Sequence, residues 1–245
     1  LDMGTVDKMC AVVLGVYDQS RRLGIPYSDV SFIQIESGFG YNAVIGVEGG
    51  RIVDGIGGTT GGPGFLSMGS MDVELAATVG HWEKADIFTG GGVSIAGRAS
   101  LEEIAEHLDQ EPCADAWNAI VEGVEKSVAS MSVSVRKPRE VLLSGRWARV
   151  PMLREELEQR LSRYAPVRNV GWLAGAQAVK EAAQGYAMVA DGLAGGQFAA
   201  LVRWMGIERA RGTALDHILH PKGRDLRRQL APWFREQSPK PETNG

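Results

Sequence analysis

The sequence has few of the residues that build disulfides, metal centres and membrane spans. Its two cysteines, Cys10 and Cys113, lie in apolar, helix-like stretches, which favours packing as small hydrophobic side chains over a disulfide or a metal site. The four histidines show no metal-ligand spacing with cysteines or acids. No apolar run approaches the ~20 residues that cross a bilayer, and no signal peptide opens the chain. We therefore expect a cytoplasmic protein that makes no membrane contact.

The charge balance argues against a second class of function. A net charge of -4 and a pI near 5.7 disfavour a general nucleic-acid-binding surface. Hydrophobic residues make up 44% and charged residues 23% of the chain, as in ordinary soluble proteins. At 245 residues the chain can bury a sizeable core as one large domain or two small ones.

Glycine, in contrast, is concentrated in one stretch. Twelve of the 32 glycines fall between Gly38 and Gly69, where average usage would give about two. Apolar residues alternate between these glycines, so the stretch is not a flexible linker. The alternation predicts three successive strands at 31–36, 42–47 and 51–56, with Glu48-Gly49-Gly50 as a hairpin turn.

Two stretches within this region are candidates for binding phosphate. The first strand ends in Gly38-Phe39-Gly40, a turn whose backbone amides can approach a phosphate closely. After the third strand, Gly57-Gly58-Thr59-Thr60 offers further amides and two hydroxyls. A structural hairpin without a ligand explains the same glycines, because a short Gly-x-Gly is a weak signal. Both interpretations stay open from glycine spacing alone.

The rest of the chain predicts an α/β domain. Helices are expected at 71–80, 100–108, 115–135 and 174–193, with another beginning at Pro151, and strands at 86–92, 140–144 and 166–170. The β-β-β-α-β-α-β-α order is that of a ribonuclease-H-like domain with one mixed sheet. Residues 1–205 would form this lobe, with a helical insertion at about 100–135. Residues 206–245 would form a charged helical segment and a solvated tail.

Three motifs occur in order along this lobe. They are D-M-G-T-x-D-K from Asp2, G-F-G-x-N-A from Gly38, and V-D-G-I-G-G-T-x-G from Val53. Together they resemble the uncharacterised, mainly archaeal family described as predicted butyrate kinases, over about residues 1–205. That family lies in the superfamily of acetate and sugar kinases, heat-shock ATPases and actin. Leu142-Leu143-Ser144-Gly145-Arg146 is similar to the adenosine motif of that superfamily.

The resemblance implies an ATP-dependent phosphotransferase of the acetate or butyrate kinase type, using ATP and Mg²⁺ on a small carboxylate or related metabolite. It also implies a preceding lobe of the same gene product across a cleft, and it leaves a homodimer open. Asp7, Thr60 and Asp72 would be catalytic, with Asp72 linked to the metal. The nucleotide would be held by Gly38, Gly40, Gly57, Gly58, Thr59, Gly145 and Arg146.

Several of these residues have ordinary structural explanations. Asp72 could be an acid facing the dipole at a helix N-terminus. Asp7 could cap the first helix, and Arg146 could be a surface arginine. Glu36, at the end of the first strand, could approach a metal-bound water or simply cap the glycine turn.

The chain also departs from the acetate kinase pattern. Met3 stands where acetate kinases have a histidine, and the stretch 68–72 lacks an arginine that they carry. Phosphoryl transfer depends on positioning and on cations that neutralise the spreading charge. The alternative is therefore a non-catalytic nucleotide-binding or regulatory module that retains the fold. Because Leu1 stands in place of an initiator methionine, we expect the natural chain to extend upstream.

Overall fold

The computed structural model describes residues 5–236. Within this range the chain divides into two compact units: the larger one ends at Glu208, and the smaller one begins at Arg209. No helix among the described residues is both long and apolar enough to cross a membrane.

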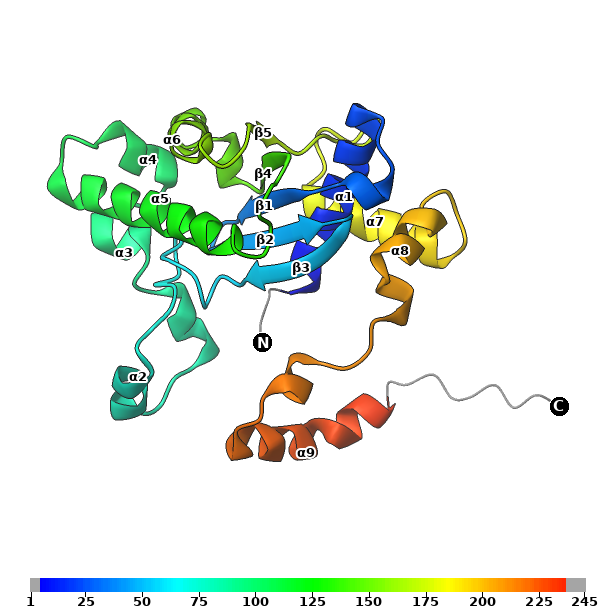
Figure 1. Ribbon diagram of the computed structural model, residues 1–245. Helices are drawn as coiled ribbons and strands as arrows, with labels where there is room; N and C mark the ends of the chain where they lie inside the picture. The colour runs from blue at the N-terminus through cyan, green and yellow to red at the C-terminus, as the bar shows by residue number, and fades with distance from the viewer. Residues whose placement is uncertain (1–4, 237–245) are drawn as a thin grey trace. The chain divides into compact units, whose positions relative to one another are not determined.

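A mixed five-stranded sheet forms the centre of the larger unit (Figure 1). Its strands stand in the order β3-β2-β1-β4-β5, with β1 antiparallel to β2 and parallel to β4. The predicted joining of the late strands to the first three in one sheet is confirmed. The strands are β1 (Phe32–Ser37), β2 (Asn42–Glu48), β3 (Arg51–Ile56), β4 (Glu140–Ser144) and β5 (Val167–Asn169).

The predicted hairpin between β2 and β3 is present and is two residues long. Gly49 and Gly50 have φ values of +58° and +67°. Two consecutive positive φ values are typical of the type I′ turn, which matches the twist of the flanking strands. The sequence Gly-Gly at this position therefore follows from the backbone that the hairpin requires.

One predicted strand is wrong. Residues 86–92 do not join the sheet; a 3₁₀ helix, Lys84–Phe88, occupies the first half and Gly90 makes only an isolated bridge to Ser67. The Asp86 carboxylate accepts a hydrogen bond from the Glu83 amide at 2.8 Å, and the Glu83 side chain caps the same turn in return. This reciprocal cap stabilises a helical turn against an extended strand.

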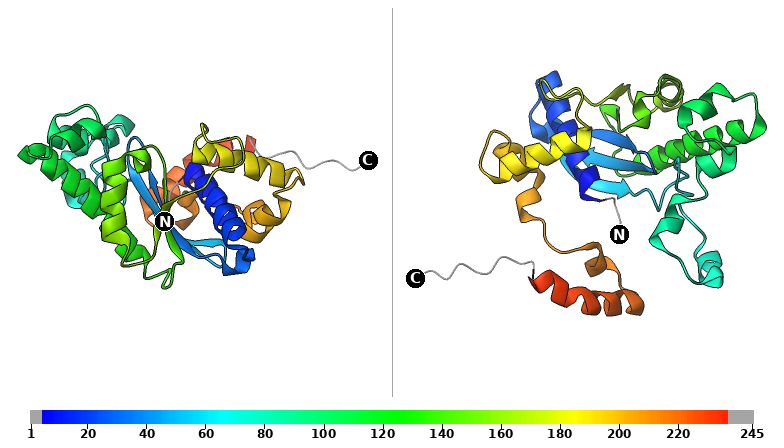
Figure 2. Two further views of the ribbon diagram at one scale, coloured as in Figure 1. Left: turned by 90° about the horizontal axis from the view of Figure 1, so that it is seen from above. Right: turned by 180° about the vertical axis from the view of Figure 1, so that it is seen from behind.

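Helices cover both faces of the sheet (Figures 1 and 2). On one face, β1 residues Ile33 and Ile35 pack with α5 and α6; on the other, Phe32 packs with α1 and α8. This alternation is the period of two expected of a strand buried on both sides. The helices of this unit are α1 (Val6–Leu23), α2 (Val73–Val79), α3 (Gly92–Ala96), α4 (Leu101–Glu106), α5 (Glu111–Met131), α6 (Pro151–Leu161), α7 (Glu181–Leu193) and α8 (Ala199–Met205).

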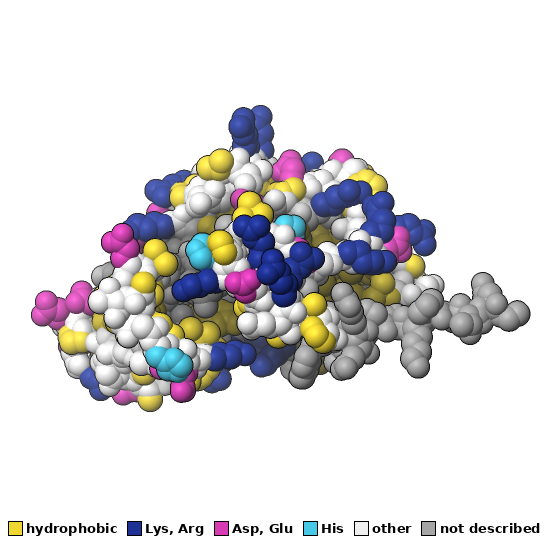
Figure 3. Space-filling view, turned by 90° about the horizontal axis from the view of Figure 1, so that it is seen from below, with side chains coloured by type: hydrophobic (Ala, Val, Ile, Leu, Met, Phe, Trp, Pro, Cys, Tyr) yellow, Lys and Arg dark blue, Asp and Glu magenta, His cyan; other side chains and the backbone are white. Residues whose placement is uncertain are grey.

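The smaller unit contains the 3₁₀ helix Ala214–His217 and α9 (Pro221–Glu236). An ion pair between Asp216 and Arg227 joins the two elements. Figure 3 shows many Lys and Arg side chains on the face that includes α9. Lys222, Arg224 and Arg228 of α9 are exposed.

The crossing of α1 and α7 depends on glycine. A Cβ atom built on Gly185 would lie 1.8 Å from the carbonyl oxygen of Cys10, so the two helix backbones touch at this point. Burial raises the pKa of the Cys10 thiol to about 11, with the charge of Asp7 adding to the effect. Cys10 is fully buried and packs as a small hydrophobic side chain.

We predict that Gly185→Ala lowers the free energy of unfolding by about 1–3 kcal/mol, because the added methyl group forces the helices apart. Urea denaturation followed by circular dichroism measures the change. Ala187→Val, on the exposed face of the same helix, adds apolar volume without a facing backbone and is the matched control. Equal stabilities for the two variants would contradict the tight crossing.

Candidate functional site

A cavity of about 370 Å³ lies at the carboxyl ends of β1 and β4. Its walls come from the start of α1, the turn after β1, the segment after β4, and the start of α7. In open α/β sheets the carboxyl ends of neighbouring parallel strands are the usual ligand-binding edge. This position makes the cavity the candidate functional site.

A buried carboxylate lies where the two parallel strands end. Glu36 on β1 is paired in register with Ser144 on β4, and the Ser144 hydroxyl donates to the Glu36 carboxylate. The Gln34 amide in turn donates to the Ser144 hydroxyl oxygen at 3.0 Å. Burial raises the pKa of Glu36; Ser144 and the Lys8 ammonium oppose that rise. The carboxyl group is thus fixed in place and holds its proton more tightly than an exposed glutamate.

The segment after β4 reaches the cavity through a required glycine. Gly145 has a φ of +92°, and a Cβ atom there would lie 2.4 Å from the carbonyl oxygen of Ser37. Both the backbone conformation and the close approach exclude a side chain. Gly145 therefore brings its backbone against the end of β1, at the mouth of the cavity.

Hydrogen bonds within the chain hold the glycine turn after β1. The Gly38 amide donates to the Tyr41 carbonyl at 3.1 Å, which closes the turn internally. The Gly40 carbonyl accepts hydrogen bonds from the amides of Leu66 and Ser67, both at 2.9 Å. This turn anchors the glycine-rich loop to the sheet, and the Gly38 amide is already engaged.

Much of the glycine richness serves close packing inside this loop. A Cβ atom on Gly58 would lie 2.1 Å from the Tyr41 ring, and one on Gly64 would lie 2.4 Å from the Tyr41 Cα atom. A Cβ atom on Gly62 would lie 2.5 Å from the Cα atom of Gly123 on α5. The structural explanation of these glycines is thus well supported.

An ion pair closes one side of the cavity. The Lys8 ammonium lies 2.5 Å from an Asp7 carboxylate oxygen and 5.4 Å from the centre of the Tyr41 ring. Burial alone would raise the pKa of Asp7, but hydrogen bonds from Lys8 and Thr5 outweigh it and lower the pKa. Asp7 is therefore a stable carboxylate beside a nearly buried lysine.

Three further cations line the cavity. The Arg146 guanidinium lies 5.2 Å from the ring centre of Phe39 and 5.0 Å from that of Trp147. Arg149 forms an ion pair of 2.9 Å with the buried Glu181, and Lys180 precedes α7. With Lys8, four cations face three acids, so the cavity can attract an anion.

The structure brings together four of the residues predicted from sequence. Asp7, Gly38, Gly145 and Arg146 all line this cavity. Five other lining residues with charged or aromatic side chains were not predicted from the sequence. These are Lys8, Phe39, Arg149, Lys180 and Glu181, of which Lys8 and Phe39 lay inside recognised motifs.

The other predicted residues lie outside the lining of this cavity. The Thr60 hydroxyl donates to the Gly57 carbonyl at 3.1 Å, and Thr59 lines a separate apolar cavity of about 270 Å³. Asp72 caps α2: its carboxylate accepts hydrogen bonds from the backbone amides of Glu74 and Leu75, each at 2.9 Å. Figure 1 shows α2 and its flanking segments extending away from the sheet.

Oxygen ligands for a metal are sparse. Among residues 5–236 no group of three or more His, Cys, Asp or Glu side chains could enclose a metal ion. Mg²⁺ needs fewer, since it keeps several waters and takes one or two carboxylates plus phosphate oxygens. Asp7 and Glu36 are carboxylates at the cavity that fit this requirement.

Comparison with known proteins identifies a family. The family model described as "Protein of unknown function (DUF1464)" matches residues 1–220, so the chain belongs to this family. No curated protein matches the sequence.

Solved structures with a similar fold include carboxylate kinases. An acetate kinase from Entamoeba histolytica is similar with a TM-score of 0.52 and 15% identity, over 63% of this chain and 43% of that one. An acetate kinase from Porphyromonas gingivalis gives 0.53 and 16%, over 61% and 41%. A propionate kinase from Francisella tularensis subsp. tularensis SCHU S4 gives 0.55 and 14%, over 66% and 51%. The chain thus has a kinase-like α/β fold and spans about half the length of these proteins or less.

We predict that Glu36→Gln changes how stability depends on pH. A raised pKa means that the contribution of Glu36 to stability is complete below its ordinary pKa of about 4.5. That contribution is then lost as pH rises through the raised value. Wild type should therefore lose stability relative to Glu36→Gln as the pH rises above about 4.5.

Urea denaturation of both proteins across this pH range measures the difference. Glu106→Gln, at an exposed position of α4, is the control for removing a surface carboxylate. A difference between wild type and Glu36→Gln that stays constant with pH would contradict the burial of an ionisable Glu36.

Proposed function

We propose that this member of the DUF1464 family is an ATP-dependent phosphotransferase acting on a small carboxylate or related metabolite. The observation that carries the proposal is the cavity at the ends of β1 and β4, with its four cations. The kinase-like fold supports it, because the similar acetate and propionate kinases are carboxylate kinases by name. The chain spans only part of those proteins, so the proposal includes a second lobe in the full-length protein.

The cavity is suited to a nucleoside triphosphate. Phosphate oxygens prefer lysine and arginine, and the Lys8, Arg146 and Lys180 side chains supply such groups from three different elements. Gly145, whose backbone packs against the end of β1, would set the segment after β4 beside the bound nucleotide. Arg146, held over two aromatic rings, would border the nucleoside.

Magnesium would neutralise charge on the transferred phosphoryl group. Asp7 and Glu36 would hold it through its water shell at the cavity, while the sequence prediction assigns this role to Asp72. Asp7 has the lowered pKa that suits a metal-facing carboxylate. The two metal assignments predict different losses of turnover for variants of Asp7 and of Asp72.

A non-catalytic nucleotide-binding module is the second candidate function. It is favoured by the pairing of Asp7 with Lys8, and by the absence of an arginine from the stretch 68–72. Binding of ATP–Mg²⁺ without turnover of any acceptor would favour the non-catalytic module.

We predict that Arg146→Gln and Gly38→Val each weaken ATP–Mg²⁺ binding about tenfold, or about 1.4 kcal/mol. The first variant removes a cation, and the second places a branched side chain at the cavity wall. Isothermal titration of ATP–Mg²⁺ into the full-length protein measures both. Lys126→Gln on α5 removes an exposed cation elsewhere and is the matched control. If all three variants bind as wild type does, the nucleotide site is not this cavity.

We predict that Asp72→Asn lowers turnover far more than ATP affinity, if Asp72 positions the metal. The side-chain oxygen of asparagine can still accept hydrogen bonds from the two α2 amides, so the helix cap is kept. The variant therefore tests the effect of the negative charge alone. Thr60→Val should give a smaller effect of the same kind. Steady-state kinetics with a panel of short-chain carboxylates measure both.

Asp7→Asn in the same assay separates the two metal assignments. Loss of turnover in Asp7→Asn with normal turnover in Asp72→Asn would move the metal site to the cavity. Absence of turnover in wild type with every acceptor would favour the binding module.

A further inference from the structure

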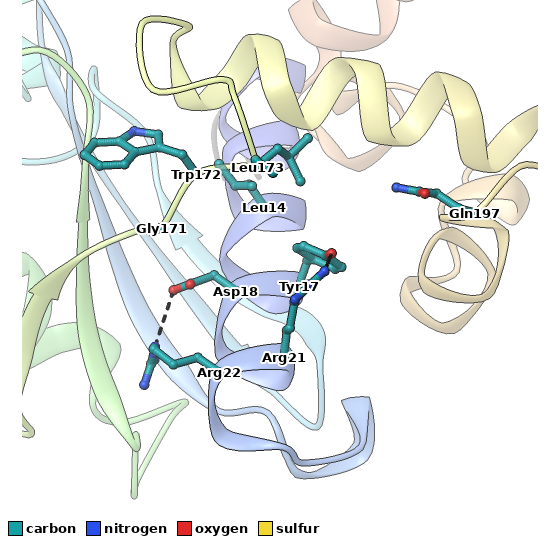
Figure 4. Close-up of a pocket in the computed structure, with 10 residues that line it drawn as sticks. Leu14, Tyr17, Asp18, Arg21, Arg22, Gly171, Trp172, Leu173 and Gln197 are labelled. Carbon is teal, nitrogen blue, oxygen red and sulfur yellow. Dashed lines mark hydrogen bonds and ion pairs between the residues drawn. The ribbon is translucent and has the colours of Figure 1, made fainter.

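A second and larger cavity, of about 680 Å³, lies along the C-terminal half of α1, whereas the site described above takes its α1 residues from the start of that helix; the two share no lining residue. Figure 4 shows its walls: α1, the segment that follows β5, and Gln197 from the turn before α8. All of these belong to the larger unit. Its volume lies within the range of small-molecule sites.

One stripe of α1 forms the wall of this cavity. Leu14, Tyr17, Asp18, Arg21 and Arg22 recur at intervals of three and four residues, so they share one helix face. The stripe changes from apolar to charged along the helix. Leu14 is buried, and Leu173, from the segment after β5, lies beside it. The cavity thus has an apolar floor next to a charged rim.

Asp18 on the rim has an acceptor that the protein does not satisfy. Its Oδ2 atom is buried without a hydrogen-bond partner. The nearest cations, Arg22 Nε and Arg168 Nη1, each lie 3.8 Å from it, an ion-pair distance too long for a hydrogen bond. Gly171 makes room for the carboxylate, since a Cβ atom there would lie 2.4 Å from Oδ1. A buried acceptor without a donor is costly, and the Asp18 side chain, 14% exposed, lines the cavity, where a ligand ammonium group would face the carboxylate.

The two arginines nearest to Asp18 are shared with another acid. Arg22 lies 2.5 Å from Glu140, and Arg168 lies 3.9 Å from the same carboxylate. The charges of Arg22 and Arg168 are therefore balanced by those of Asp18 and Glu140. Burial raises the pKa of Asp18, and the Gly171 amide and Arg22 oppose that rise. The cluster leaves Asp18 short of donors.

Arg21 adds an exposed cation next to Asp18. Its guanidinium donates to the Tyr17 hydroxyl at 2.5 Å and lies 5.8 Å from the centre of that ring. Figure 4 shows Arg21 lying along Tyr17, while Asp18 is directed toward Gly171. The rim therefore offers an acid and a base three residues apart on one helix, where side chains are neighbours.

We propose that this cavity binds a small α-amino acid with an apolar side chain. The ammonium group would donate to Asp18, the carboxylate would pair with Arg21, and the side chain would lie over Leu14 and Leu173. An ammonium group carries three donors, and a carboxylate matches a guanidinium. An amine without a carboxylate would pair only with Asp18, and a carboxylic acid without an amine would pair only with Arg21.

The test titrates L-leucine and L-phenylalanine into the protein without nucleotide, by isothermal titration or protein-observed NMR. We expect saturable binding with a Kd of about 1 mM or tighter. 4-Methylpentanoate lacks the ammonium group and isopentylamine lacks the carboxylate, and each should bind at least about tenfold more weakly than leucine. Because no nucleotide is present, failure here is separate from failure of the proposed phosphotransferase.

Two variants locate the site. Arg21→Gln and Asp18→Asn should each weaken amino acid binding at least about tenfold, while Lys126→Gln should leave it unchanged. Arg21 is exposed, so its variant keeps the test valid even if Asp18→Asn disturbs the ion cluster. No saturable binding at about 10 mM of either amino acid would overturn the proposal. So would equal binding by the two single-charge analogues, or unchanged binding in Arg21→Gln.

Discussion

The parallel pairing of β1 with β4 is the constraint on which the candidate site depends. These strands are separated by more than a hundred residues of chain, yet their register sets Glu36 against Ser144. The same register brings Gly145 so close to Ser37 that only glycine fits. Residues from α1 and α7 then complete the cavity, because α1 packs on the sheet and α7 packs against α1, which it touches at Gly185. Loss of the β1–β4 register would separate the lining groups at the end of β1 from those that follow β4.

Local patterns predicted most of the fold. The Gly-Gly hairpin, the three early strands and the late strands are readable because alternation and turn chemistry act over a few residues. The segment 86–92 was misread for the same reason: its apolar residues fit a short strand, and the reciprocal cap between Glu83 and Asp86 decided for a helical turn.

The site was less readable than the fold. Asp7, Gly38, Gly145 and Arg146 stood in motifs at element ends, and the sheet gathers them. Arg149 and Glu181 form an ion pair across 32 residues, and no local pattern signals such a pair. Glycine density was only a partial guide, since Gly58 and Gly64 are explained by close packing against Tyr41. Similarly, Asp18 became a candidate only through its surroundings in space.

The central claim is that nucleotide phosphates bind at the carboxyl ends of β1 and β4. The most direct measurement is a crystal structure of the protein with a non-hydrolysable ATP analogue and Mg²⁺. The account predicts phosphate oxygens within hydrogen-bond distance of Lys8 or Lys180 and the nucleoside beside Gly145 and Arg146. Ordered nucleotide at another position, such as the cavity between α1 and Gly171, with the β1–β4 cavity empty, would contradict it.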